Sequence, residues 1–363
     1  MMLLLLALGL GFLVAGATMI IRGGALLAAR LGLSPLVIGM TVVAFSASSP
    51  ELVVSLGAVI GGVPDVAVGA VVGSNIFNVL FTLGLAALVA PLVVSNHLLR
   101  YGVPLMILVA TMFYLMSGDR VISRTEGGVL VACLIAATTA MIYFGRRKGE
   151  GEVAPHDLPS PLPVGSSLKR EVLLVLGGLV ITSLGSHWFV DGAVQLARWM
   201  GVSNLVIGLT VVAVGASLPE LITTVVASLR GDRDIAVGNV VGSIIFNILG
   251  VLGLTAMLAP NGLPIPPVAI AFDIPVMVAV ALVCLPIFFT GGEIARWEGA
   301  LLLIYYLIYA IYLVLAASKD DDLEAFGEVV LWYVIRPTVF SLLICVALAW
   351  WRKWKTQRAQ SAA

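Results

Sequence analysis

Residues 39–84 begin with GMTVVAFSASSPELVV and end with DVAVGAVVGSNIFNVLFTLG, and this stretch recurs later in the chain. Residues 208–253 read GLTVVAVGASLPELIT and DIAVGNVVGSIIFNILGVLG at the same places, at a constant offset of 169 residues. The identical positions include Pro50 and Pro219 as well as several polar residues, which hydrophobic composition alone would not align. The match therefore indicates an internal duplication.

Composition points to a membrane protein. Apolar residues make up 60% of the 363 residues and charged residues only 11%, whereas a soluble domain carries about 25% charged residues. The apolar residues form runs of about 17 to 25 residues, the length that a helix needs to cross a bilayer. An all-α polytopic protein with ten spanning helices and one extra C-terminal helix is therefore expected. The expected spans are 3–21, 33–61, 65–90, 101–117, 127–144, 171–191, 204–229, 234–259, 268–290, 297–316 and 329–351.

The duplicated unit is expected to contain five helices. It divides the chain into a first repeat, a linker, a second repeat, and an extra helix with a basic tail. These parts are 1–144, 145–170, 171–316 and 317–363. Because five is odd, the second repeat must begin on the opposite side of the membrane from the first, so that the repeats are inverted. Inverted repeats suit a carrier that works by alternating access.

The placement of basic residues predicts the orientation. Lys and Arg collect in cytoplasmic loops, and they gather in the linker, which contains Arg146 and Arg147, and in the C-terminal tail. This places the N-terminus outside and the C-terminus in the cytoplasm of an inner or plasma membrane. The net charge of zero gives no indication of a nucleic-acid partner.

Two acidic residues stand out at membrane depth. Glu51 and Glu220 occupy matching positions inside apolar segments, where a carboxylate costs about 2.5–3.5 kcal/mol. The repeats contain no basic residue at comparable depth that would pair with them. A bound cation is the remaining partner.

Each glutamate follows a proline, in Ser48-Ser49-Pro50-Glu51 and in Ser217-Leu218-Pro219-Glu220. Proline inside a helix removes a hydrogen-bond donor and displaces the carbonyl four residues earlier. The carbonyls of 44–47 and 213–216 are therefore expected to turn toward an ion. Irregular backbone of this kind is tolerated at membrane depth only where it lines a cavity or is buried in protein.

The helix after each glutamate adds neutral oxygen ligands. A serine and an asparagine four residues apart share one helix face in each repeat, and nearby glycines allow close helix approach. The two pairs are Ser74 with Asn78 and Ser243 with Asn247, and the glycines are Gly69, Gly73, Gly238 and Gly242. Carboxylate, amide, hydroxyl and carbonyl oxygens select hard cations, and this set suits Ca2+ better than Mg2+.

The Ser-x-Pro-Glu and Gly-Ser-x-x-x-Asn motifs, each present twice, resemble those of the Ca2+/cation antiporter superfamily, in particular the prokaryotic Na+/Ca2+ exchangers. The resemblance covers both repeats and leaves the eleventh span unmatched. It implies exchange of Ca2+ for Na+, with no enzymatic activity, no cofactor and no required protein partner. The side chains that it implies as ligands are Glu51, Ser74, Asn78, Glu220, Ser243 and Asn247, supported by Ser48 and Ser217. The carbonyls that it implies are those of Ala44, Ala47, Ala213 and Ala216.

Three positions depart from the family pattern. The family commonly has threonine where this chain has Ala47 and Ala216, and many Na+-coupled members have aspartate where it has Asn247. Two glutamates are neutralised by one Ca2+ or by two H+, whereas three Na+ would leave a net positive charge. An H+/Ca2+ antiporter, or one for another divalent cation, is thus the alternative to Na+ coupling. A passive channel is less favoured, and an intramembrane hydrolase less still.

Overall fold

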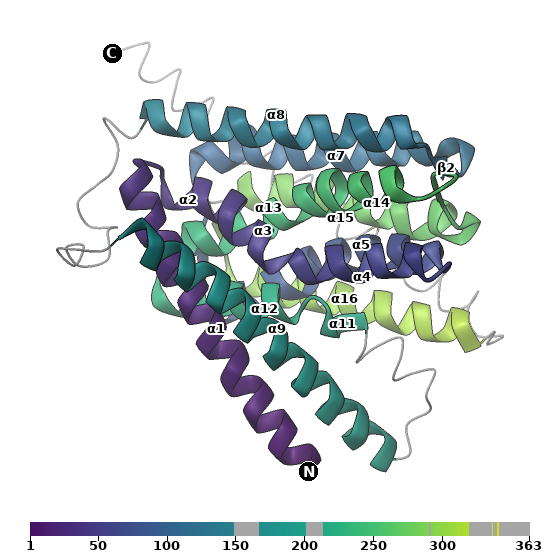
Figure 1. The fold of residues 1–363 in the computed structure, drawn as a ribbon, viewed down its shortest axis with the longest axis horizontal. Coiled ribbons are helices and arrows are strands. Elements are labelled where there is room, and N and C mark those ends of the chain that lie inside the picture. Colours follow the sequence, from purple (N-terminus) through teal and green to yellow (C-terminus); the bar gives the residue numbers. More distant parts are fainter. Residues whose placement is uncertain (149–166, 201–212, 290–291, 319–335, 337–339, 341–363) are drawn as a thin grey trace.

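The structure is a computed structural model that describes residues 1–148, 167–200, 213–289, 292–318, 336 and 340 (Figure 1). The elements of the first half are α1 (Met2–Leu31), α2 (Pro35–Ile38), η1 (Gly39–Val43), α3 (Ala44–Ala47), α4 (Ser49–Ile60), α5 (Pro64–Phe77), η2 (Asn78–Leu83), α6 (Gly84–Val89), β1 (Leu92–Val93), η3 (Leu98–Gly102), α7 (Val103–Met116), η4 (Ser117–Asp119), β2 (Val121–Ile122) and α8 (Arg124–Lys148). Those of the second half are α9 (Leu168–Trp199), α11 (Ala213–Gly215), α12 (Leu218–Arg230), α13 (Arg233–Phe246), η6 (Asn247–Leu252), α14 (Gly253–Leu258), β3 (Leu263–Pro264), η7 (Ala269–Asp273), α15 (Ile274–Phe289), β4 (Glu293–Ile294) and α16 (Arg296–Ser318). The described chain is therefore mostly helical.

The described helices are those of an integral membrane protein. Eight helical segments are long and apolar enough to cross a membrane, and a bent pair, Pro35–Ala47 with Ser49–Ile60, makes nine. Large apolar side chains such as Leu108 and Leu115 are 63% and 72% exposed, as expected for surfaces that face lipid. Of the expected spans, 204–229 is described only from residue 213 and 329–351 only at two residues. Most of the expected linker also lies outside the described residues.

The expected limits of two spans were wrong. The first span was expected at 3–21, but α1 continues to Leu31, and the span expected at 171–191 belongs to the longer α9. Charged residues such as Arg22 and Asp191 do not end these helices, because long or terminal polar groups can reach water from a continuous helix. The break expected within 33–61 is confirmed, since the backbone turns by 42° between α3 and α4.

Helices α1 and α9 form a long antiparallel pair that leans away from the other helices (Figure 1). Glycines seven residues apart line the contact from both sides, namely Gly9, Gly16 and Gly23 on α1 and Gly178, Gly185 and Gly192 on α9. A Cβ added at Gly9 would lie 2.8 Å from the Cα of Phe189, and one at Gly185 would lie 2.6 Å from the backbone nitrogen of Leu13. Only glycine allows this backbone approach.

An ion pair closes one end of the α1–α9 pair. The Arg30 Nε donates to both carboxylate oxygens of Glu171, at 2.9 and 2.7 Å. The Glu171 side chain is 1% exposed, while that of Arg30 is 38% exposed. Burial of the carboxylate makes this pair stronger than an ordinary surface ion pair, because water screens it less.

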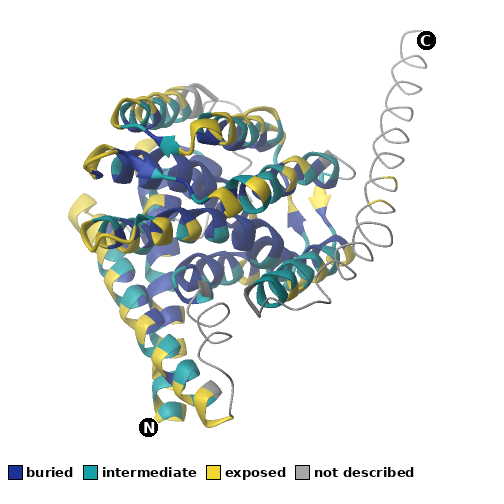
Figure 2. Cartoon of the chain, turned by 90° about the vertical axis from the view of Figure 1, so that its right-hand side faces the viewer, coloured by how far each residue is buried: buried dark blue, intermediate teal, exposed yellow. Residues whose placement is uncertain are grey.

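Helix α13 lies at the centre of the remaining bundle. All residues in the most apolar stretch of Arg233–Leu258, which contains α13, are buried, whereas only 11% of those in Arg124–Tyr143 and in Arg296–Ala316 are. Figure 2 shows the buried residues gathered in the interior of the bundle. A Cβ at Gly238 would lie 2.9 Å from the Leu36 carbonyl oxygen, and one at Gly242 would come closer still to Met40 and Ala44. The close approach expected at these two glycines is therefore confirmed. Gly69 and Gly73 match Gly238 and Gly242 in the repeat. The stretch of the second half on which they would pack falls within 201–212, outside the described residues.

The two halves interlock. Helix α16 packs on α6 through Gly299 and Gly84, and α8 packs on α14 through Gly127 and Gly253. The short strands also pair across the halves, β1 with β4 and β2 with β3, both antiparallel. Matching elements thus make matching contacts with the opposite half.

Candidate functional site

The backbone breaks at the same place in both halves. Ser48 has φ −87° and ψ 6°, and Ser217 has φ −91° and ψ 7°, so that one helical segment ends and another begins. Pro50 and Pro219 fall in the first turn of the new helices α4 and α12. The sequence predicts a helix break at each proline, with a simple kink as the alternative. The structure has the break, and a new helix starts at each proline, because proline is favoured in the first turn, where its missing N–H costs nothing.

Glu51 and Glu220 therefore stand in the first turns of α4 and α12. Both side chains are completely buried. The N-terminal end of a helix carries a partial positive charge that stabilises a nearby carboxylate. The break thus offsets part of the cost of burying each acid.

Serines from opposite halves bind the two carboxylates. The Ser48 hydroxyl donates to Glu220 Oε1 at 2.8 Å, and the Ser217 hydroxyl donates to Glu51 Oε1 at 3.1 Å. The Ser74 hydroxyl lies 2.7 Å from that of Ser217 and 3.4 Å from Glu51 Oε1. The structure therefore brings residues that lie far apart in the sequence into one cluster.

Two asparagines follow in the neighbouring helices, each at the start of a π-helical turn. Asn78 begins η2 and Asn247 begins η6, and both are completely buried. π-Helical turns within α-helices are frequent at functional sites. The widened turn occurs at the same place in both halves, which fits a conserved local geometry rather than an accident of packing.

Five of the predicted ligand residues contain buried polar atoms that have no hydrogen-bond partner among the described residues. They are Glu51 Oε2, Glu220 Oε2, Ser243 Oγ, Asn247 Oδ1 and Asn78 Nδ2. No Lys, Arg or His in the described part of the chain forms an ion pair with either glutamate. Most of these atoms are oxygens that can coordinate a cation. Buried and unpaired groups of this kind are costly unless something binds them.

The carbonyls freed by the prolines lie within the expected stretches 44–47 and 213–216. The Ala44 carbonyl, expected as a ligand, accepts the Ser48 N–H at 2.9 Å. The missing N–H groups of Pro50 and Pro219 leave the carbonyls of Ser46 and Gly215 without their helical donors.

In the second half, a side chain of another helix takes the place of the missing Pro219 N–H. The Ser186 hydroxyl on α9 donates to the Gly215 carbonyl at 2.6 Å. Ala47, Ala213 and Ala216 lie at the two breaks, as expected.

Several polar residues of this region were not expected from the sequence. Asn75 contacts Asn247, and Asn239 donates to the Glu220 carbonyl at 3.4 Å and to Thr224 at 2.9 Å. Thr82 donates to Asn78 Oδ1 at 3.4 Å. A comparison of the repeats does not identify them, because the positions that match Asn75, Asn239 and Thr82 are the apolar residues Ile244, Ala70 and Val251. The signal that could have identified the two asparagines is their position within apolar helices, where polar side chains are rare and usually functional.

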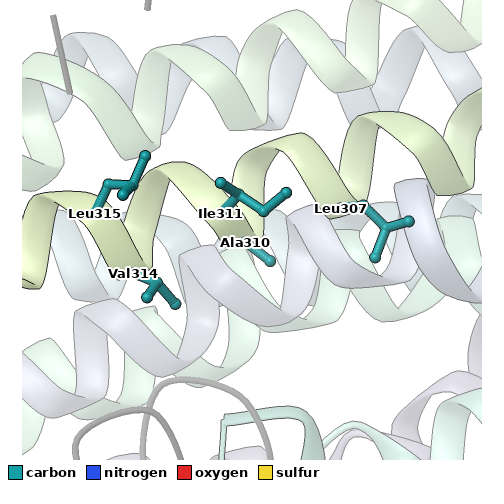
Figure 3. A pocket seen from close by; sticks show the side chains of 5 residues that line it. All are labelled: Leu307, Ala310, Ile311, Val314 and Leu315. Carbon is teal, nitrogen blue, oxygen red and sulfur yellow. The ribbon is translucent and has the colours of Figure 1, made fainter. Parts of the chain in front are cut away.

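A shallow hollow on α16 has different chemistry. It is lined by Leu307, Ala310, Ile311, Val314 and Leu315 (Figure 3). These side chains are apolar and carry no cation ligand. The hollow suits an acyl chain or another apolar surface, so the polar cluster remains the candidate site.

Comparisons with known proteins agree with one another. The profile described as sodium/calcium exchanger protein matches residues 1–143 and 171–315. CaxA of Alkalimonas amylolytica is 36% identical over 304 residues, which are 83% of this chain and 95% of CaxA. The sodium/calcium exchanger MaX1 of Methanosarcina acetivorans is 33% identical over 344 residues, covering 85% of this chain and 97% of MaX1. A structure of the sodium-calcium exchanger NCX_Mj, soaked with zero Na+ and Ca2+, superposes with a TM-score of 0.72 at 29% identity, covering 86% of this chain and 98% of that chain.

Proposed function

Because the chain belongs to the sodium/calcium exchanger family, we propose that it moves Ca2+ across the membrane in exchange for Na+ by alternating access. It is a transporter and not an enzyme. The observation that carries the proposal is the pair of completely buried glutamates, each bound by a serine of the opposite half and each with an oxygen that has no partner in the described part of the chain. Ca2+ prefers six to eight oxygen ligands, with carboxylates among them.

The proposed ligands extend beyond the glutamates. Ser74, Asn78, Ser243 and Asn247 supply neutral side-chain oxygens, and Ser48 and Ser217 hold the carboxylates. Four backbone carbonyls are proposed as ligands in another conformation of the carrier, because in this one the Ala44 carbonyl accepts a hydrogen bond from the Ser48 N–H. They are those of Ala44, Ala47, Ala213 and Ala216. Movement at the two breaks would change which carbonyls face the ion.

The proposed architecture has two inverted repeats of five helices, 1–144 and 171–316, followed by an extra helix and a cytoplasmic tail within 317–363. The antiparallel α1–α9 pair and the matching contacts between the halves support this arrangement. The cell membrane is the proposed location, with the N-terminus outside, because the basic residues gather in the linker and the tail.

A second candidate is exchange of Ca2+ for H+. Ala47, Ala216 and Asn247 favour it, because they lack two hydroxyls and one carboxylate that Na+-coupled relatives commonly have. Two protons neutralise the glutamates as one Ca2+ does. The family as a whole favours Na+, which we keep as the first candidate.

Coupling is tested with purified protein in liposomes. Radiolabelled Ca2+ should accumulate in Na+-loaded liposomes diluted into choline, and accumulation should fall to the level of protein-free liposomes when no gradient opposes Ca2+. A matched arm replaces the Na+ gradient with a pH gradient and identifies H+ as the driving ion if only that arm works. Equal Ca2+ flux with no counter-ion gradient would identify a passive channel and refute the exchange.

The choice of driving ion is tested by restoring the family pattern. The triple substitution Asn247→Asp, Ala47→Thr and Ala216→Thr adds a carboxylate and two hydroxyls, and we expect Na+-driven Ca2+ flux to rise severalfold, because the added charge favours a third Na+. The Asn75 amide must turn over so that its NH2 group faces the new carboxylate, since in the parent its oxygen faces residue 247.

The assay is run at high pH, where the new aspartate is least protonated, beside the parent and the two threonine substitutions alone. A Na+-driven rate in the intact triple variant at or below that of the parent would separate these three positions from ion choice.

A further inference from the structure

Asn75 lies between Asn247 and a methionine of a third helix. The Asn247 Nδ2 donates to Asn75 Oδ1 at 3.1 Å, and the Asn75 Nδ2 donates to the Met277 sulfur at 3.4 Å. All three side chains are at most 2% exposed. They come from η6, α5 and α15, so the contact joins helices of both halves.

The chemistry of the three groups determines which way each amide points. A thioether sulfur accepts hydrogen bonds but has no proton to donate. The NH2 group of Asn75 therefore turns toward Met277, and its oxygen turns toward Asn247. Asn247 must then present its own NH2 group to Asn75, which leaves its Oδ1 on the other corner of the amide, buried and without a partner among the described residues.

We propose that Asn75, with Met277 behind it, is a positioning residue that keeps the Asn247 oxygen turned toward the transported cation. The inference rests on the proposed function, in which Asn247 is a ligand. An amide free to turn over would present its NH2 group to the cation for part of the time, and that end repels positive charge. Groups behind a metal ligand commonly tune affinity in this way.

The arrangement belongs to one half. The positions that match Asn75 and Met277 are Ile244 and Leu108, which offer no such contacts. Asn78, the match of Asn247, is held instead by Thr82 through its oxygen, and its NH2 group is without a partner among the described residues. The two asparagines match in sequence, but Asn247 is held by its NH2 group and Asn78 by its oxygen, so Asn247 is the stronger ligand of the two.

The test is a double-mutant cycle on purified protein in liposomes. Asn75→Leu keeps the branched shape of the side chain and removes both hydrogen bonds, so we expect the Ca2+ concentration for half-maximal transport to rise about tenfold. Met277→Leu leaves the contact between the asparagines in place, and we expect a rise of about twofold to threefold. Ile244→Leu, the substitution at the matching position, should leave it unchanged.

The cycle separates positioning from a merely structural role. With Asn247→Ala present, Asn75→Leu should cause no further rise, because no amide remains to be oriented. An equal rise in both backgrounds, or no rise in the parent, would overturn the inference. Ca2+-dependent shifts of the melting temperature in detergent, recorded for the same variants, show whether a variant without transport is still folded and binds Ca2+. A parent protein that neither transports nor binds Ca2+ would overturn the proposed function itself.

Discussion

Ca2+ transport is expected to fall to background when either Glu51 or Glu220 is replaced by glutamine. Each substitution keeps the side-chain volume and an oxygen that can accept the hydrogen bond from Ser217 or Ser48. It removes one of the two negative charges that balance a divalent cation. In a site shielded from water, that loss is far larger than at a surface.

The folded protein should persist in both variants. Each glutamine avoids the cost of burying a charge, about 2.5–3.5 kcal/mol on the lenient insertion scale, so the melting temperature without Ca2+ should stay the same or rise. The Ca2+-dependent increase in melting temperature should disappear together with transport. Radiolabelled Ca2+ uptake in liposomes and thermal unfolding in detergent check the two parts.

Glu126→Gln is the matched control. Glu126 caps α8 by accepting hydrogen bonds from the Ser123 backbone and hydroxyl, at 2.8 and 2.7 Å, and a glutamine oxygen can accept the same bonds. Transport by this variant should equal that of the parent. Normal transport by both Glu51→Gln and Glu220→Gln would show that the site lies elsewhere.

Loss of folded protein is the expected result of Gly185→Leu. The added Cβ would lie 2.6 Å from the Leu13 nitrogen and 2.8 Å from the Gly9 carbonyl oxygen, both backbone atoms that cannot turn aside. Overpacking a well-packed site costs about 1–3 kcal/mol and sometimes more. Here the two helices must separate, and with them the contacts along their whole length.

Gly11→Leu on the same pair of helices is the control, because a Cβ there meets nothing within 4 Å among the described residues. The amount of monodisperse protein on size-exclusion chromatography and its melting temperature should fall sharply for Gly185→Leu and stay at the parental value for Gly11→Leu. Parental values for both would refute the role of the glycine contact.

The helical, membrane-embedded character of the chain was predictable because it depends on local properties. Long apolar runs such as 65–90 reappear as continuous helical segments within two residues of the expected limits. The ends of α1 and α9 were not predictable, since the two helices pack on each other through glycines, a contact between segments far apart in the sequence. Propensity and hydropathy contain no information about such a partner.

The candidate site was predictable to a similar extent. The duplicated proline and glutamate motif identified Glu51 and Glu220, because a repeated carboxylate in an apolar segment is costly and needs a reason. The surroundings of the carbonyls depend on the tertiary fold, since the Gly215 carbonyl, within the expected stretch 213–216, accepts a hydrogen bond from Ser186 of another helix. Asn75 was not predicted, because the matching position in the second repeat is the apolar residue Ile244.

The sequence by itself determined that this protein is duplicated, lies in a membrane and carries a pair of acids with neutral oxygens at matching places. Repetition, hydropathy and residue chemistry are properties of short segments, so they can be read without coordinates. Only the tertiary structure decided which atoms meet: Ser48 with Glu220, Ser217 with Glu51, and the amide of Asn247 with that of Asn75. These partners lie 172, 166 and 172 residues apart, and hydrogen-bond direction depends on how helices of opposite halves pack together.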